Sequence, residues 1–412
     1  MKKIIAVFLT VIIFACAFPF AAFAEEADYA YDTEYYSKLK DKNITLNVYN
    51  WGEYISDGSD ESLDVVKEFE ALTGINVEYT TFDSNESLFA KLKSGSASYD
   101  VIIPSDYMVA RLAEAGMLQK LNYENIPNFN KYIDEGFKNP EYDKQNEYSV
   151  PYMWGSVGVI YNTKYVDEAD VADKSWNLLW NEKYAGKILM FDNSRDAFAI
   201  ACKKLGYSMN TTDKDELAKA ADELAAQREI VQAYVMDQIF DKMVEENAWI
   251  APYYAGDYLS MAEDNEDLAF YIPVEGTNLF TDAMCVPATS TNREAAEMFI
   301  NFMCEPTVSA ANADYIWYST PVSAAKDILE LDEETLEISY PDDEAKANME
   351  VFTNLSDEAN QLMDDLWISA VRTNELTPGF WISVAVICVI ILFAVFRNMY
   401  IKKKRMEARM KY

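Results

Sequence analysis

The chain has 412 residues, a formal net charge of −34 at neutral pH and no histidine. Its length is sufficient for two or three domains with hydrophobic cores of their own. The absence of histidine excludes hydrolases that depend on a serine–histidine or cysteine–histidine pair, and it excludes histidine metal ligation. The acidic balance disfavours nucleic acid and anionic lipid headgroups as partners and favours cations.

The N-terminal segment 1–24 has the three regions of a secretory signal peptide. A positively charged start is followed by an apolar run and by small residues around Ala24, so we expect cleavage after Ala24. Lipid attachment at Cys16 is an alternative that the flanking residues fit poorly. Residues 25–43 are acidic and tyrosine-rich without an apolar period, and we expect them to form a spacer.

From residue 44 onward, apolar runs typical of strands alternate with segments whose apolar residues recur at helical spacing. In the first unit we expect strands at 44–49, 75–79 and 99–103. We expect three helices, one near 61–72, a second that begins after Asp83 and a third that ends near Gly116. Asp83 and Glu86 have the spacing of a capping box for the second of these helices.

A second unit begins after a stretch rich in tyrosine, asparagine and proline at 122–151. We expect strands near 157–161, 187–191, 249–254, 268–272 and 282–286 and helices near 195–205, 213–228, 234–246, 292–304 and 344–374. The alternation predicts an α/β fold whose parallel sheets carry helices on both faces.

The segment 379–396 carries no charge, and its length is near the lower limit for a membrane-spanning helix. The tail 397–412 is basic, and basic flanks of this kind remain in the cytoplasm. We therefore expect a single-pass protein of the cell membrane, with its body on the extracytoplasmic side. A buried core helix is the weaker alternative, because only a basic tail follows the run.

The cysteines of the body, Cys202, Cys285 and Cys304, are odd in number and lack CxxC spacing. This pattern argues against a disulfide framework and against a zinc site. We therefore expect no metal and no cofactor.

Aromatic and acidic residues recur directly after the predicted strands, where ligands of open parallel sheets bind. The four segments are Trp51-Gly52-Glu53-Tyr54, Pro104-Ser105-Asp106-Tyr107, Asp192-Asn193-Ser194-Arg195-Asp196 and Tyr254-Ala255-Gly256-Asp257. Arg195 is the one basic residue among them. A phosphate site would need glycine-rich turns and donors instead. Rings and carboxylates suit an organic cation, held by cation–π attraction and charged hydrogen bonds.

At these residues the chain resembles the spermidine/putrescine-binding proteins of ABC importers. The resemblance runs from about 44 to 375, and its ordered matches include VYNWGEYI, YDVIIPSDY, YSVPYMWGSVGVIYN, VEGTNLFTDAMCVP and YSTPVSAA. It implies a two-lobed periplasmic-binding-protein fold of type II, each lobe a mostly parallel sheet flanked by helices. It also implies a monomer that closes on a polyamine and delivers it to permease subunits served by a cytoplasmic ATPase.

We expect the domain order of that family, with one C-terminal transmembrane helix added. The predicted parts are lobe 1 at 44–155, lobe 2 at 156–279, a return to lobe 1 at 280–325, and C-terminal helices at 326–376 that pack on lobe 2.

The resemblance also implies which residues bind the ligand. The expected ring contacts are Trp51, Tyr54, Tyr107, Tyr254, Phe280 and Tyr318. The expected polar and acidic contacts are Glu53, Ser105, Asn193, Asp196, Asp257 and Asp282, with Arg195 orienting Asp196 through an ion pair.

Two departures from the family pattern bear on the ligand. Asn193 occupies the place of a second aspartate in the spermidine-preferring pattern, although a slip of one residue would put Asp192 there. Gly52 replaces a side chain that commonly donates a hydrogen bond. Because asparagine cannot match the charge of a middle ammonium, we favour putrescine and retain spermidine as possible.

The sequence therefore predicts a non-enzymatic polyamine-binding subunit that does not bind nucleic acid. One alternative is a binding protein for another small cationic or amine solute, and a distant one is a glycoside hydrolase with paired carboxylates. Individual residues also have simpler interpretations. Phe280 and Tyr318 could be core residues, and Asp257 could be only a first-turn acid favoured by the helix dipole.

Overall fold

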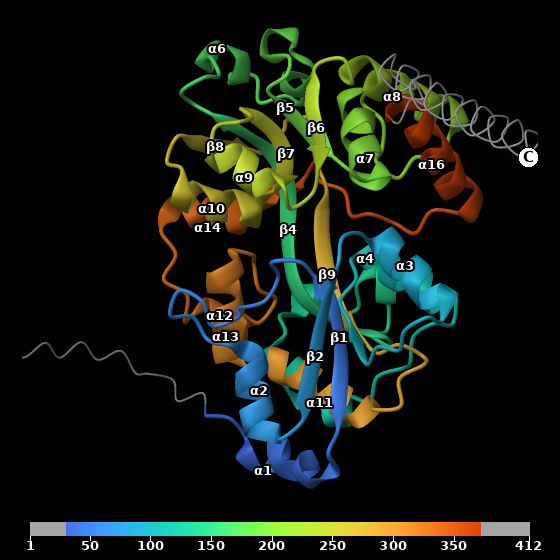
Figure 1. The fold of residues 1–412 in the computed structure, drawn as a ribbon, viewed down its shortest axis with the longest axis vertical. Coiled ribbons are helices and arrows are strands. Elements are labelled where there is room, and N and C mark those ends of the chain that lie inside the picture. The colour runs from blue at the N-terminus through green and yellow to red at the C-terminus, as the bar shows by residue number, and fades with distance from the viewer. Residues whose placement is uncertain (1–29, 372–412) are drawn as a thin grey trace, which may run out of the picture.

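The computed structural model describes residues 30–371, which form two halves joined by long strands (Figure 1). The nine strands of this described part form one sheet in the order β2-β1-β3-β9-β4-β7-β5-β6, with β8 paired to β4. Helices cover the sheet in both halves, as the alternation of elements predicts.

The lower half in Figure 1 is built around three parallel strands, β1 (Thr45–Trp51), β2 (Asn76–Phe82) and β3 (Val101–Ile102). Its helices are α2 (Val65–Thr73), α3 (Asn85–Ser94), α4 (Asp106–Glu114), α5 (Pro127–Tyr132), α11 (Arg293–Met303), α12 (Pro306–Ile316) and α13 (Ser323–Lys326). The ends of β1 and β3 point toward the other half and carry the first site residues.

The upper half contains β5 (Ile188–Phe191), β6 (Val231–Val235), β7 (Ile250–Tyr254) and β8 (Leu268–Tyr271). Its helices are α6 (Glu168–Val171), α7 (Ser194–Lys204), α8 (Lys214–Gln227), α9 (Ile239–Val244) and α10 (Ala255–Asp264). The late helices α14 (Glu333–Ser339) and α16 (Asp357–Val371) pack on this half, against α10 and against α7 and α8 respectively.

Two antiparallel strands, β4 (Ser149–Asn162) and β9 (Leu279–Cys285), run between the halves (Figure 1). β4 pairs with β9 along its first part and with β7 and β8 along its second. The predicted lobe boundaries fall inside these two strands. The prediction of mostly parallel sheets is wrong for this central region, because a chain that crosses and then returns makes antiparallel neighbours.

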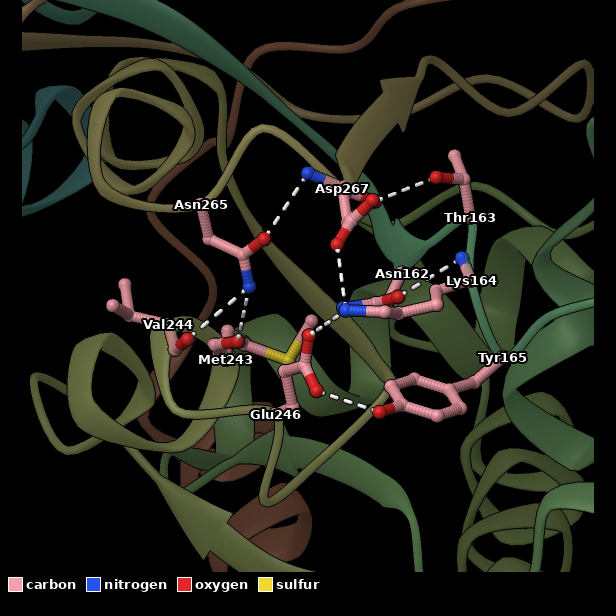
Figure 2. A network of polar contacts seen from close by, with 9 residues as sticks. All are labelled: Asn162, Thr163, Lys164, Tyr165, Met243, Val244, Glu246, Asn265 and Asp267. Atoms are coloured by element: carbon pink, nitrogen blue, oxygen red, sulfur yellow. Dashed lines mark hydrogen bonds and ion pairs between the residues drawn. The ribbon is translucent and has the colours of Figure 1, made fainter.

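The end of β4 farthest from the other half is fixed by a polar network that joins three loops (Figure 2). Lys164 Nζ lies 2.8 Å from a Glu246 carboxylate oxygen and 3.0 Å from an Asp267 carboxylate oxygen. The Tyr165 hydroxyl donates to Glu246 at 2.6 Å, and Asn265 Nδ2 donates to the Val244 carbonyl at 3.1 Å. The network holds the crossing strand at its outer end, well away from the cleft.

The prediction that residues 25–43 form a spacer is wrong for the described part of this segment, residues 30–43. It forms α1 (Thr33–Tyr36) and a 3₁₀ helix (Ser37–Lys42), and the Tyr36 side chain is completely buried. Tyr36 packs on the Phe302 ring at 5.8 Å and its hydroxyl donates to Glu305 at 2.7 Å. A single tyrosine and leucine bury this segment, which is too few residues for an apolar period to be visible.

Three further local predictions differ from the structure. The helix expected at 234–246 begins at Ile239, because the alternating residues 231–235 pair with β5 as a strand. The capping box of α3 uses Ser84 and Ser87 in place of Asp83 and Glu86. The helix expected at 344–374 divides into α15 (Asp343–Lys346) and α16, with an irregular segment between them that buries Phe352.

The predicted signal peptide, membrane span and basic tail, at 1–24, 379–396 and 397–412, lie outside the described residues. Within residues 30–371, the structure contains no helix with the length and apolar character needed to cross a membrane.

Replacing Tyr36 by phenylalanine is expected to lower the free energy of unfolding by about 1–3 kcal/mol, because the buried Glu305 carboxylate loses its phenol donor. Urea unfolding followed by circular dichroism measures the change. As a control, Tyr165→Phe removes a hydroxyl contact at a residue that is 37% exposed and should have little effect. Equal effects of the two substitutions would contradict the assignment of residues 30–43 to the core.

Candidate functional site

A cavity that is partly open to solvent lies where the strand ends of the two halves meet. Every residue predicted to bind the ligand lines it. These residues are Trp51, Glu53, Tyr54, Ser105, Tyr107, Asn193, Asp196, Tyr254, Asp257, Phe280, Asp282 and Tyr318. Arg195 does not line it. The lining contains no lysine and no arginine among the described residues, so the carboxylates of the cavity have no cationic partner there.

Asp282 lies on β9, and its side chain is 5% exposed. The Tyr54 hydroxyl donates to Asp282 Oδ2 at 2.7 Å, and Ser105 Oγ donates to Oδ1 at 2.6 Å. Burial raises the pKa of Asp282 to about 6, although both hydrogen bonds oppose this rise. Both donors come from the lower half, at the ends of β1 and β3, so these strand ends fix the carboxylate on the crossing strand.

Asp257 lies in the first turn of α10 and accepts a hydrogen bond from the Tyr318 hydroxyl at 3.0 Å. Burial raises its pKa to about 8. The two residues come from opposite halves, and Gly256 permits their approach. A Cβ atom at Gly256 would lie 2.4 Å from the Tyr318 ring.

Asp196 lies in the first turn of α7, which Asn193 caps. Asn193 accepts from the Asp196 amide at 2.8 Å and donates from Nδ2 to Asp196 Oδ2 at 2.8 Å. The Tyr254 hydroxyl also donates to Asp196 Oδ2, at 3.2 Å. Burial raises the pKa of Asp196 to about 6. Asn193, and not the exposed Asp192, lines the cavity.

The rings of the cavity pack edge to face, which holds their π faces in fixed directions. Tyr54 and Tyr318 have centroids 4.8 Å apart at an interplanar angle of 83°, and Tyr254 and Phe280 have centroids 5.4 Å apart at 76°. Phe280 and Tyr318 therefore serve both the core and the cavity wall. The role of a core residue and the role of a cavity-lining residue are therefore compatible at these positions.

The predicted ion pair between Arg195 and Asp196 is wrong. The buried Arg195 guanidinium donates to Asn210 Oδ1 at 2.7 Å and to the Thr353 carbonyl at 3.3 Å, and it lies over the Phe352 ring at 4.3 Å. Adjacent residues of a helix do not face each other, so the side chains at 195 and 196 diverge. Arg195 instead anchors the segment that carries Phe352, a residue of the cavity wall.

The sequence reasoning missed several lining residues, most notably Glu86 and Asp237. Glu86 follows β2 and accepts from the Tyr107 hydroxyl at 2.9 Å, and burial raises its pKa. Asp237 follows β6, and one of its oxygens lies 2.8 Å from where a Cβ atom at Gly52 would be. The strand-end signal applies to both residues. The sequence interpretation places Glu86 in a capping box, and it expects a helix from residue 234 and no strand at 231–235.

A family model described as "Bacterial extracellular solute-binding protein" matches residues 96–347 of this chain. The "Spermidine/putrescine-binding periplasmic protein" of Escherichia coli is 34% identical over 311 residues, which cover 75% of this chain and 87% of the relative. The "Putrescine-binding periplasmic protein SpuD" of Pseudomonas aeruginosa is 30% identical, covering 79% of this chain and 91% of the relative.

Solved structures of proteins from polyamine transporters also resemble this chain. A "Putative spermidine/putrescine ABC transporter from Listeria monocytogenes" superposes with a TM-score of 0.73 at 36% identity, covering 79% of this chain and 98% of that one. The substrate-binding protein PotD of Streptococcus pneumoniae, crystallised with calcium and HEPES, gives 0.66 at 35% identity with the same coverage. These similarities confirm the predicted periplasmic-binding-protein fold, and the family is one of binding proteins, which agrees with the prediction that the chain is not an enzyme.

The comparisons contradict the predicted location in the cell membrane. The curated relatives are named as periplasmic proteins, which overturns the single-pass assignment.

The raised pKa of Asp257 makes the stability of the unliganded protein depend on pH. Below about pH 4 its carboxyl is protonated in both states, and its contribution to the free energy of unfolding is lost as pH rises toward about 8. Asp257→Asn carries no such titration and keeps an acceptor for Tyr318. The stability of the variant relative to the wild type should therefore increase between pH 5 and pH 8.5 in urea unfolding. A pH-independent difference would show that Asp257 titrates normally.

Proposed function

We propose that this chain, which belongs to the bacterial extracellular solute-binding protein family, is the binding subunit of an ABC importer that captures a polyamine. It would deliver the polyamine to membrane permease subunits driven by a cytoplasmic ATPase. Putrescine is the favoured ligand, and spermidine is the competing one.

The observation that carries this proposal is a cavity lined by aromatic rings and carboxylates without a basic residue. A carboxylate taken out of water requires a partner charge, and an ammonium group supplies one. The methylene chain of a polyamine packs on the ring faces, which also attract the ammonium ends. We assign Asp196, Asp257 and Asp282 to the ammonium groups, and Trp51, Tyr54 and Phe280 to the chain between them.

The named relatives support the class of ligand, since several are described as binding spermidine and putrescine or putrescine alone. The preference for putrescine rests on Asn193, whose neutral side chain is already bonded to Asp196 at the place of a second carboxylate. Spermidine competes because Glu86 and Asp237 add carboxylates to the cavity lining.

Contacts between the halves support capture by closure. Tyr318 donates to Asp257 across the cleft, and Asp237 Oδ2 lies 2.8 Å from where a Cβ atom at Gly52 would be. Closure removes water from the carboxylates, which is unfavourable until a cation neutralises them. A bound polyamine therefore shifts the population toward the closed form, in proportion to its tighter contact with that form.

The alternative of another small amine solute needs the same carboxylates and differs only in the length and shape of the ligand. A competition series of amines against putrescine separates the two. The hydrolase alternative loses its support, because the family is one of solute-binding proteins.

Replacing Asp282 by alanine should weaken putrescine binding 10-fold or more, on the order of about 2–5 kcal/mol for a lost buried charge partner. Isothermal titration calorimetry with putrescine and spermidine measures the change. Asp192→Ala is the matched control, since Asp192 is an exposed acid that lies just before α7 and outside the cavity. No heat from a folded wild-type protein with either polyamine would falsify the proposed function, and unchanged affinity of the Asp282 variant would move the site elsewhere.

Polyamine affinity should fall as pH decreases from 8.5 to 5. Burial raises the pKa of the unliganded Asp196 and Asp282 carboxyls to about 6 and that of Asp257 to about 8, while an ammonium binds the ionised forms. Protons are therefore released on binding in this range. Calorimetry in two buffers with different ionisation enthalpies measures the release. An affinity that is constant over this range would contradict the proton linkage.

A further inference from the structure

We infer that Asn278 is a further ligand-binding residue, whose side-chain carbonyl accepts a hydrogen bond from the ligand ammonium held by Asp196. The inference rests on the proposed polyamine function and names a contact that specifies where one ammonium sits.

Asn278 lies directly before β9 and is one of the residues that line the cavity. Successive side chains of a strand alternate between faces, so positions 278, 280 and 282 share one face. Phe280 and Asp282 are already on the cavity side, and Asn278 continues that row. The main chain at Asn278 is fixed by its carbonyl, which accepts from the Val157 amide at 3.3 Å.

The Asn278 side chain is 4% exposed, and its Oδ1 has no hydrogen-bond partner among the described residues. A buried acceptor without a donor is unfavourable, because it loses water and gains nothing in return. An unpaired buried acceptor on a residue that lines a cavity indicates a place where a donor of the ligand can bind. Trp51 Nε1 is also buried and unpartnered at this cavity, but it is a donor. A protonated polyamine offers only donors, so it matches Asn278 and not the Trp51 nitrogen.

Asp196 supplies the charge at the same place. Asp196 and Asn278 both line the main cavity and also a second, much smaller one, so the two residues lie near each other where these cavities meet. The donors from Asn193 and Tyr254 both bond to Asp196 Oδ2, which leaves Oδ1 for the ligand. One ammonium has enough N–H groups to donate to Asp196 Oδ1 and Asn278 Oδ1 together.

The test compares Asn278→Leu with the wild type by calorimetry, using putrescine and spermidine. Loss of a hydrogen bond to a charged group predicts about 10- to 100-fold weaker binding. The melting temperature of the unliganded variant should equal or exceed that of the wild type, because leucine removes an unpaired buried acceptor. Weaker binding together with a lower melting temperature in the unliganded state would indicate a structural role and overturn the inference.

Two further variants keep the test decisive if Asn278→Leu folds poorly. Asn278→Asp retains acceptor oxygens and should bind within a few-fold of the wild type at pH 8, whereas a 10-fold loss would overturn the inference. In a double-mutant cycle, Asp196→Asn and Asn278→Leu should be non-additive because they act on one ammonium. Additive losses would place Asn278 at another part of the ligand and overturn the shared contact.

Gln227→Met is the matched control, since Gln227 is also a buried amide with an unpartnered side-chain oxygen, but it lies outside the cavity. It should leave polyamine affinity unchanged. If the wild type binds polyamines and Asn278→Leu binds equally well, only the inference fails. If the folded wild type binds neither polyamine, the proposed function fails and the inference fails with it.

Discussion

Buried carboxylates without a basic partner are the constraint that organises this protein. Asp282, Asp257 and Asp196 each receive a tyrosine hydroxyl, from Tyr54, Tyr318 and Tyr254. A phenol satisfies an oxygen of the carboxylate but adds no positive charge, so burial still raises the pKa of each acid. The same tyrosines present their rings to the cavity. One residue type thus holds the acids in place, builds the apolar wall and leaves the charge for the ligand to neutralise.

The topology explains why these groups meet. Strands of the two halves end at a common cleft, and the crossing strand β9 carries Asp282 and Phe280 through it. Because β4 and β9 connect the halves, the proposed closure of the cleft would bend the chain at these crossing strands. Close approach then depends on small residues, and Gly256 admits the Tyr318 ring where a Cβ atom would collide with it. The carboxylates that closure would remove from water and the contacts that would stabilise the closed form therefore lie in the same cleft.

Much of the cavity lining could be predicted from the sequence, because strand ends with rings and acids are a local pattern. That pattern located Trp51, Tyr54, Asp196 and Asp257 without any knowledge of pairing. It failed at Asp237, because no strand was expected at 231–235 and the helix expected at 234–246 includes Asp237. It could not find Asn278, which precedes its strand. β9 runs antiparallel to its neighbours, so both the start and the interior of this strand border the cleft. Only the pairing shows this.

Without a ligand, the closed form of the cleft is energetically unfavourable. Acids with raised pKa values and the unpaired Asn278 oxygen both disfavour a dry, closed cleft, and opening it returns these groups to water. A ligand with ammonium groups reverses each of these costs, since it supplies charge to the acids and donors to the oxygens. A neutral solute of the same shape would reverse neither. Under the proposed function, the closed state is unfavourable without a cation, and this disfavours neutral solutes.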